Sequence, residues 1–251
     1  VHGGALLNPL QALMQACASL HDQEGRVTVP GFYDAVRPPE QWEREELAKL
    51  PITEEDYAKF LGVPEFFPPP GYSSLEGIRF CPTLEFNGVG GGYQGEGSKT
   101  VIPAEAFAKI TCRLVPDQKS EDIANKVRQA IEEACPSAVR VEVELKGGGD
   151  PYVVIPPGKP GSSGQESELM KKAFSVAEDC IESGFGTRPI FLREGGSIPI
   201  IQDLKELAGL DSLMIGLFTN EDNLHAPDES FNLTIMDRAI NSFEEFFKQL
   251  I

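Results

Sequence analysis

Apolar residues recur at helical spacing in two segments of the first half of the chain. The first segment follows Asn8 and Pro9, a capping side chain and a proline at the first helical position, and predicts a helix over residues 9–21. The second follows Ser120, which is expected to cap a helix in which Ile123 and every fourth residue after it are apolar. Both helices are therefore expected to be amphipathic.

Strict alternation of apolar and polar residues predicts strands elsewhere. The alternation is clearest over residues 104–115 and returns over 139–145, and a short strand is expected at 26–29. Helix, strand, strand, helix, strand is the order of a split βαβ sandwich, the ferredoxin-like arrangement, without its first strand. We expect the missing strand to lie just before Val1.

Two other features divide the chain. Residues 31–77 contain an acidic stretch and a second helix start at Thr53, and are expected to form an excursion with two short helices. A segment rich in glycine and proline, Pro156–Gly164, is expected to be a domain boundary. Beyond it we expect part of an α/β layer domain, of fewer than 100 residues, with helices over 166–183 and near 199–208, strands over 189–192 and 213–218, and a final helix opened by Asn232.

The composition of the chain argues against nucleic acids and anionic membranes as binding partners. The 251 residues carry a formal net charge of −17, so phosphate backbones and anionic membrane surfaces would be repelled. No apolar run approaches the roughly 20 residues that span a bilayer. The five cysteines are odd in number, widely spaced and mostly set in apolar segments, which favours reduced thiols in a cytoplasmic protein.

Three histidines are candidates for metal chemistry. His2 lies beside two glycines and His21 ends the first predicted helix, so both are expected to be structural. His225 lies in a polar loop directly after an apolar strand, where α/β proteins place ligands, and a neutral imidazole there is suited to zinc. From these residues alone, His225 is either a metal ligand or a structural loop residue.

Two glycine-containing segments are candidates for anion binding. Arg193-Glu194-Gly195-Gly196-Ser197 follows a predicted strand and precedes a helix, so its N–H groups, the Ser197 hydroxyl and Arg193 would suit a carboxylate or a phosphate. The alternative is a tight turn with Arg193 in a surface ion pair. The glycine-rich run Gly88–Gly97 lacks the Lys-Ser/Thr of a phosphate loop and is interpreted as a flexible loop ending at Lys99-Thr100.

Six motifs in order resemble the family of dinuclear zinc exopeptidases and amidohydrolases that includes carnosinase, cytosolic dipeptidase, glutamate carboxypeptidase, aminoacylase and acetylornithine deacetylase. The similarity covers the whole chain and is greatest to the dipeptidase branch. The motifs are Val1-His2-Gly3-Gly4 with Asn8-Pro9, Gly31-Phe32-Tyr33-Asp34, Lys99-Thr100-Val101-Ile102-Pro103, Arg113-Leu114-Val115-Pro116, the segment from Arg193 to Pro199, and His225-Ala226-Pro227-Asp228-Glu229.

The resemblance implies a lid and dimerisation domain over residues 1–158, followed at 159–251 by the C-terminal segment of an α/β catalytic domain. By position, His225 matches the last histidine ligand of one zinc, and Arg113 an arginine that binds the substrate carboxylate. Thr100 matches a lid residue that reaches the substrate across the dimer. Gly196 and Ser197, with Arg193, match a turn that also holds the substrate. Asp228 stands where relatives often carry asparagine.

The chemistry implied is hydrolysis of a dipeptide or similar amide with a free carboxylate, by water held between two zinc ions, with manganese or cobalt as possible substitutes. The other ligands and the glutamate base belong to the family's upstream half, so the fragment alone is expected to be inactive. Two alternatives stay open: an N-acyl or N-carbamoyl amino acid amidohydrolase, and a non-catalytic dimerisation module. A homodimer through the lid is expected, without nucleic acid or membrane partners.

Overall fold

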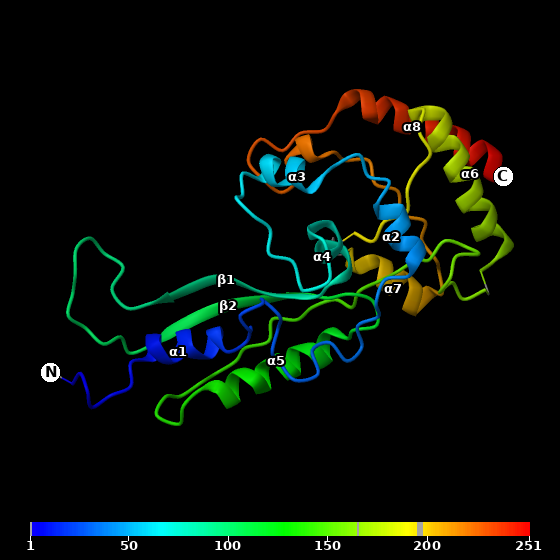
Figure 1. Cartoon of the computed structure of the whole chain (residues 1–251). Helices are drawn as coiled ribbons and strands as arrows, with labels where there is room; N and C mark the ends of the chain where they lie inside the picture. Colours follow the sequence, from blue (N-terminus) through cyan, green and yellow to red (C-terminus); the bar gives the residue numbers. More distant parts are fainter. Residues whose placement is uncertain (1, 165, 195–197) are drawn as a thin grey trace. The chain divides into compact units, whose positions relative to one another are not determined.

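The structure, a computed structural model, describes residues 2–164, 166–194 and 198–251 (Figure 1). It divides into two compact units. The first unit contains Val1–Pro39, Pro51–Tyr152 and Arg193–Gln202, and the second contains Glu40–Leu50, Val153–Leu192 and Asp203–Ile251. The chain thus passes between the units several times, and its class is mixed α and β, as the sequence predicted.

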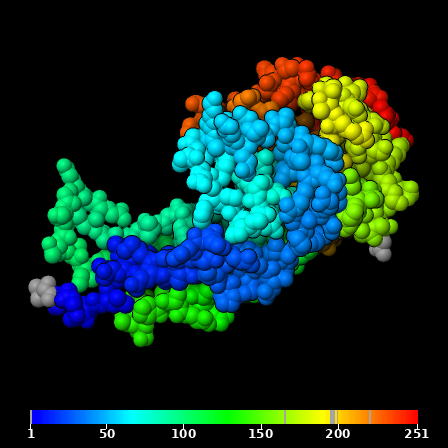
Figure 2. Space-filling view, in the orientation of Figure 1, coloured from blue at the N-terminus to red at the C-terminus, as the bar shows by residue number. Residues whose placement is uncertain are grey.

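An antiparallel hairpin is the centre of the first unit. Strand β1 (Thr83–Gly91) pairs with β2 (Ala106–Arg113), from Thr83 opposite Arg113 at one end to Gly91 opposite Ala106 at the other. β2 confirms the strand predicted over 104–115. β1 was not predicted, and the interpretation of Gly88–Gly97 as a loop is wrong for the residues up to Gly91. In this unit the segment between the strands projects as the free tip of the hairpin (Figures 1 and 2).

Two helices lie on one face of the hairpin (Figure 1). Helix α1 (Pro9–Ala18) begins as predicted, because the Asn8 side chain accepts a hydrogen bond of 3.0 Å from the Leu10 N–H. Helix α5 (Ser120–Ala134) begins differently. Ser120 is its first residue rather than its cap, and the Asp150 carboxylate accepts a 2.8 Å hydrogen bond from the Ser120 N–H. The predicted cap is supplied by an acidic residue 30 positions later in the chain.

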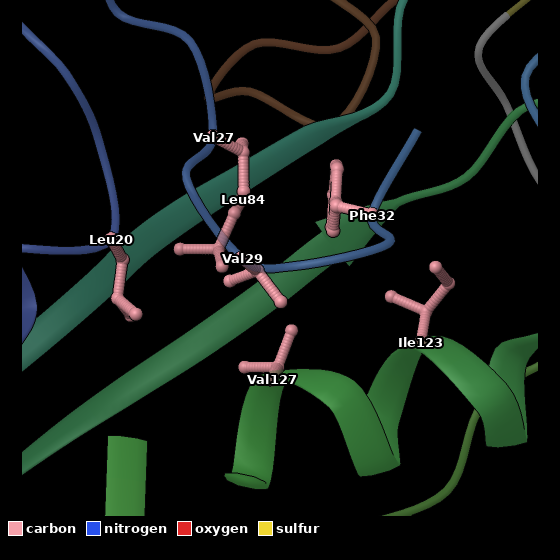
Figure 3. Packing of buried hydrophobic residues seen from close by; sticks show 7 residues of the cluster. All are labelled: Leu20, Val27, Val29, Phe32, Leu84, Ile123 and Val127. Atoms are coloured by element: carbon pink, nitrogen blue, oxygen red, sulfur yellow. The ribbon is translucent and has the colours of Figure 1, made fainter. Parts of the chain in front are cut away.

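The core of the first unit forms between the hairpin, α5 and the segment that follows α1. In Figure 3, Ile123 and Val127 of α5 point toward the strands and toward Phe32, which is fully buried. The four-residue spacing predicted for α5 therefore marks the face that packs. The buried cluster consists of Leu20, Val27, Val29, Phe32, Leu84, Ile123 and Val127.

The excursion contains more helix than predicted. Instead of two short helices over 31–77 there are three: α2 (Gln41–Leu47), α3 (Glu54–Leu61) and α4 (Ser74–Phe80). Thr53 caps α3, and α4 has a reciprocal capping box between Ser73 and Glu76. α4 was missed because only its capping residues and one short turn distinguish it from the loop around it.

The second unit is built on two long helices, α6 (Glu168–Phe185) and α8 (Leu233–Leu250), which pack against each other. Asn232 caps α8 as predicted, accepting a hydrogen bond of 2.9 Å from the Thr234 N–H. Gly184 allows the helices to approach, since a Cβ at this position would meet the Ser242 hydroxyl. Helix α7 (Pro199–Ala208) continues from the first unit into the second, and Asn220–Asp222 forms a short 3₁₀ turn.

Several predicted strands do not form. In the described residues, the sheet consists of β1 and β2, and the segments 26–29, 139–145, 189–192 and 213–218 are not strands. Burial still alternates along three of them. Val27 and Val29 are buried between exposed residues, Val139, Val141 and Val143 are half-buried between exposed residues, and Leu213, Ile215 and Leu217 alternate with exposed residues. Apart from Leu145, which is exposed, the burial pattern is therefore as predicted, but a strand also requires a neighbouring backbone for its hydrogen bonds.

Candidate functional site

Arg113 is the last residue of β2, and its side chain is exposed. Burial alternates along the strand, so Ile110 and Cys112 face the core while Arg113 and Thr111 face away from it. Burial raises the pKa of the Cys112 thiol to about 11, and the nearby Glu85 charge adds to the effect. The strand therefore anchors one face in the core and presents Arg113 on the other.

Thr100 is exposed in the segment that joins the two strands. Beside it is an open hollow of about 360 Å³, in which the Lys99 ammonium lies 5.7 Å from the centre of the Tyr93 ring. The Tyr93 hydroxyl donates a 3.0 Å hydrogen bond to the Glu96 carbonyl, which orders this tip. Because Arg113 ends β2 at the opposite end of the hairpin, one copy of the chain does not bring Thr100 and Arg113 together. The hollow is lined by Gly91, Gly92, Tyr93, Lys99, Val101, Pro103, Ala104 and Glu105.

Arg193 lies at the same end of the hairpin as Arg113. Its guanidinium carbon is 5.3 Å from the centre of the Phe80 ring, and Phe80 ends α4 three residues before β1 begins. The neighbouring Glu194 forms an ion pair, with its carboxylate 3.7 Å from the Arg79 guanidinium. Gly196 and Ser197 fall outside the described residues, so their predicted roles stay predictions.

His225 lies in the second unit, in a loop with an unusual backbone. Asn223, His225 and Asp228 all have positive φ angles, of 51°, 62° and 62°, a conformation that asparagine, aspartate and histidine tolerate better than most residues. Buried Asp222 organises the loop: its carboxylate accepts a 2.6 Å hydrogen bond from the Thr219 N–H, and its carbonyl accepts one of 2.8 Å from the Ser230 N–H. The loop thus holds His225 in a defined turn.

His225 does not have a full set of metal ligands around it. Among residues 2–164, 166–194 and 198–251, no group of three or more His, Cys, Asp or Glu side chains could hold a metal ion. The centre of the His21 ring lies 5.9 Å from that of Phe86, in an edge-on contact. A metal at His225 would therefore need ligands from elsewhere.

One buried carboxylate was not singled out by its sequence. The side chain of Glu46 in α2 is only 8% exposed. Its carboxylate accepts a hydrogen bond of 2.7 Å from the Lys49 ammonium and one of 3.3 Å from the backbone N–H of Phe191. The spacing of Glu46 and Lys49 is visible in the sequence. The contact with Phe191 crosses 145 positions and has no local signal.

A family model and two solved structures resemble the chain. The model of the peptidase dimerisation domain of the M20 family matches residues 1–139. An M20 family metallo-carboxypeptidase from Sulfolobus solfataricus superposes with a TM-score of 0.81 at 28% identity, covering 99% of this chain and 54% of that one. Human carnosine dipeptidase 1 superposes with a TM-score of 0.77 at 25% identity, covering 99% and 50%.

Two curated relatives of the chain are named as dipeptidases. The Cys-Gly metallodipeptidase DUG1 of Candida albicans is 27% identical over 93% of this chain and 46% of its own length. The human Beta-Ala-His dipeptidase is 26% identical over 99% of this chain and 47% of its own length. The chain thus spans just under half the length of these relatives. In its described residues, no helix is both long and apolar enough to cross a membrane.

Proposed function

The chain belongs to the M20 family with the peptidase dimerisation domain, and from that premise we propose that it is part of a metal-dependent dipeptidase. The observation that carries the proposal is the likeness over nearly the whole chain to proteins named as metallodipeptidases. The substrate would be a dipeptide or a similar small amide with a free carboxylate. Residues 1–158 would form the lid and dimerisation domain, and 159–251 the C-terminal segment of the catalytic domain.

The substrate carboxylate would be bound by Arg113. Its exposed guanidinium, at the end of a strand anchored in the core, can form two parallel hydrogen bonds to a carboxylate, which favours a free C-terminus over an internal peptide. Arg193 would strengthen the positive potential at the same end of the hairpin, and Gly196 and Ser197 would complete the turn that holds the substrate. Thr100, at the far end, would act on the site of a second copy.

The M20 family implies a metal cofactor, and we propose two zinc ions per subunit in the complete enzyme. His225 fits as one imidazole ligand, and the remaining ligands and the general base would come from outside the described residues. Zinc, when bound, supplies a water of lowered pKa and polarises the amide carbonyl. In this chain, Arg113 and Arg193 would bind and orient the substrate, and His225 would be one ligand of the metal.

The dimerisation domain supports a homodimer, which we propose forms through the lid. The five thiols, none of which forms a disulfide in the described residues, support a reducing compartment such as the cytoplasm.

A substrate panel tests the proposal. Protein expressed from the complete coding sequence would be assayed with dipeptides, the same dipeptides amidated at the C-terminus, and N-acyl and N-carbamoyl amino acids, with and without zinc after chelation. We expect zinc-dependent hydrolysis of free dipeptides and little of the amidated forms. Preference for acyl or carbamoyl amino acids would move the protein to the amidohydrolases, and inactivity of a fully metallated dimer would favour a dimerisation module.

A further inference from the structure

Helix α2 belongs to a different part of the molecule from its neighbours in sequence. Residues Glu40–Leu50 pack in the second unit, with Val153–Leu192, whereas the residues on either side of them belong to the first unit. The proposed domain division places α2 in the lid. Its contacts therefore attach a lid segment to the part of the chain that leads to Arg193.

Two side chains hold α2 in place. The Trp42 indole N–H donates a hydrogen bond of 3.1 Å to the Pro160 carbonyl, and the Lys159 ammonium lies 5.4 Å from the centre of the indole ring. The Glu46 carboxylate is shared between Lys49 at 2.7 Å and Lys159 at 3.8 Å. Trp42 and Glu46 thus both contact the glycine- and proline-rich linker at Lys159–Pro160.

The second oxygen of Glu46 makes a different contact. It accepts a hydrogen bond of 3.3 Å from the backbone N–H of Phe191, whose ring also lies 6.0 Å from that of Phe174 in α6. Phe191 precedes Arg193 by two residues. A buried carboxylate is costly unless paired and hydrogen-bonded, and Glu46 is both, by groups from three separate segments.

We propose that Glu46 is a positioning residue for the substrate-carboxylate site: by fixing the backbone at Phe191, it holds the chain two residues before Arg193. The inference rests on the proposed function. Loss of an interaction made equally with bound substrate and transition state raises KM and leaves kcat unchanged.

The test is a comparison of three variants in the protein from the complete coding sequence, with a dipeptide substrate. Glu46→Ala is expected to raise KM about tenfold with kcat changed less than about twofold, because substrate binding is weakened. Glu46→Gln keeps an oxygen that accepts from the Phe191 N–H and is expected to stay within about threefold of the unaltered KM. Glu45→Ala is the control, since Glu45 is the exposed neighbour and its carboxylate accepts a 3.2 Å hydrogen bond from Gln41 of the same helix.

Metal content and dimer mass are measured for each variant, so that loss of the site as a whole is recognised. A Glu46→Ala protein that folds, keeps its metal and has a KM within about twofold of the unaltered protein would overturn the proposal. So would a Glu45→Ala protein with an equal rise in KM.

A second measurement tests the proposal even if the Glu46→Ala protein does not fold. Hydrogen exchange at the Phe191 amide is expected to be slow in the unaltered protein and in Glu46→Gln, and an amide that exchanges as fast as an exposed one in the unaltered protein overturns the inference. This readout also separates the two proposals. If the unaltered protein hydrolyses no dipeptide, the proposed function fails, whereas exchange at Phe191 still decides whether Glu46 holds the backbone there.

Discussion

The buried side chain of Gln118 donates a 2.8 Å hydrogen bond from Nε2 to the backbone carbonyl of Phe32, 86 residues earlier in the chain. Its Oε1 accepts a second bond of 2.9 Å from the Val115 N–H. One amide thus satisfies two backbone groups at the edge of the core, beside the most deeply buried aromatic side chain of the first unit.

Replacing this amide should destabilise the first unit. Gln118→Leu leaves a buried N–H and a buried carbonyl without partners, and is expected to lower the free energy of unfolding by about 2–3 kcal/mol. Urea denaturation measures the change. Gln129→Leu is the matched control, because Gln129 is exposed on α5 and donates a 2.7 Å hydrogen bond to Glu133 of the same helix. Equal midpoints for the two variants would mean that the Gln118 bonds contribute nothing.

Arg113→Lys in the complete enzyme is expected to lower kcat/KM by more than about tenfold, at least ~1.4 kcal/mol, because lysine cannot make the paired hydrogen bonds of a guanidinium. Folding should be unaffected, since the side chain is exposed. Steady-state kinetics with a free dipeptide measures the effect, and Arg140→Lys, another exposed arginine, is the control. An unchanged kcat/KM would remove Arg113 from the site.

His225→Ala in the complete enzyme is expected to lower the occupancy of one of two metal ions and to leave the dimer intact, because the ligand lies in the part beyond the lid. Mass spectrometry measures the metal content, and light scattering measures whether the dimer is intact. His21→Ala, which removes the ring packed on Phe86, should alter stability but not metal content. Two full equivalents of metal in the His225 variant would sink the assignment.

The thiol of Cys112 should make stability depend on pH. Its pKa is raised in the folded state, from 9.0 to about 11, so the unfolded chain releases this proton first. The contribution is fully present below about pH 9 and is lost as pH rises toward about 11. Urea midpoints measured across this range should fall more steeply for the unaltered chain than for Cys112→Val. Parallel curves would show that the thiol is not buried.

The limits of prediction from sequence have physical causes in this chain. β2 and α5 were predictable because each buries one face, and the period of apolar residues records which face. β1 was hidden, since Gly88, Gly90 and Gly91 show no alternation and the strand is irregular between Phe86 and Gly88. The segment predicted as a strand over 139–145 has the expected burial over 139–143 but no hydrogen-bonded partner strand, because pairing depends on a neighbouring segment.

The candidate site divides in the same way. The exposure of Arg113 follows from alternation along β2, and the position of His225 after an apolar segment is local as well. The bond from Glu46 to Phe191 and the cap that Asp150 supplies to α5 join residues far apart in sequence. Local pattern identifies the side chains that face solvent, whereas the contacts that hold them depend on the folded chain.

The register of the hairpin has a genetic consequence. Seven strand steps of about 3.3 Å separate Ala106 from Arg113, so Thr100 at the tip lies more than about 20 Å from Arg113 in its own chain. If each site takes Arg113 from one subunit and Thr100 from the other, two proteins of lowered activity, Thr100→Ala and Arg113→Lys, should complement each other when co-expressed. Every mixed dimer would contain one intact site and one doubly altered site, recovering about half of the normal activity per mixed dimer.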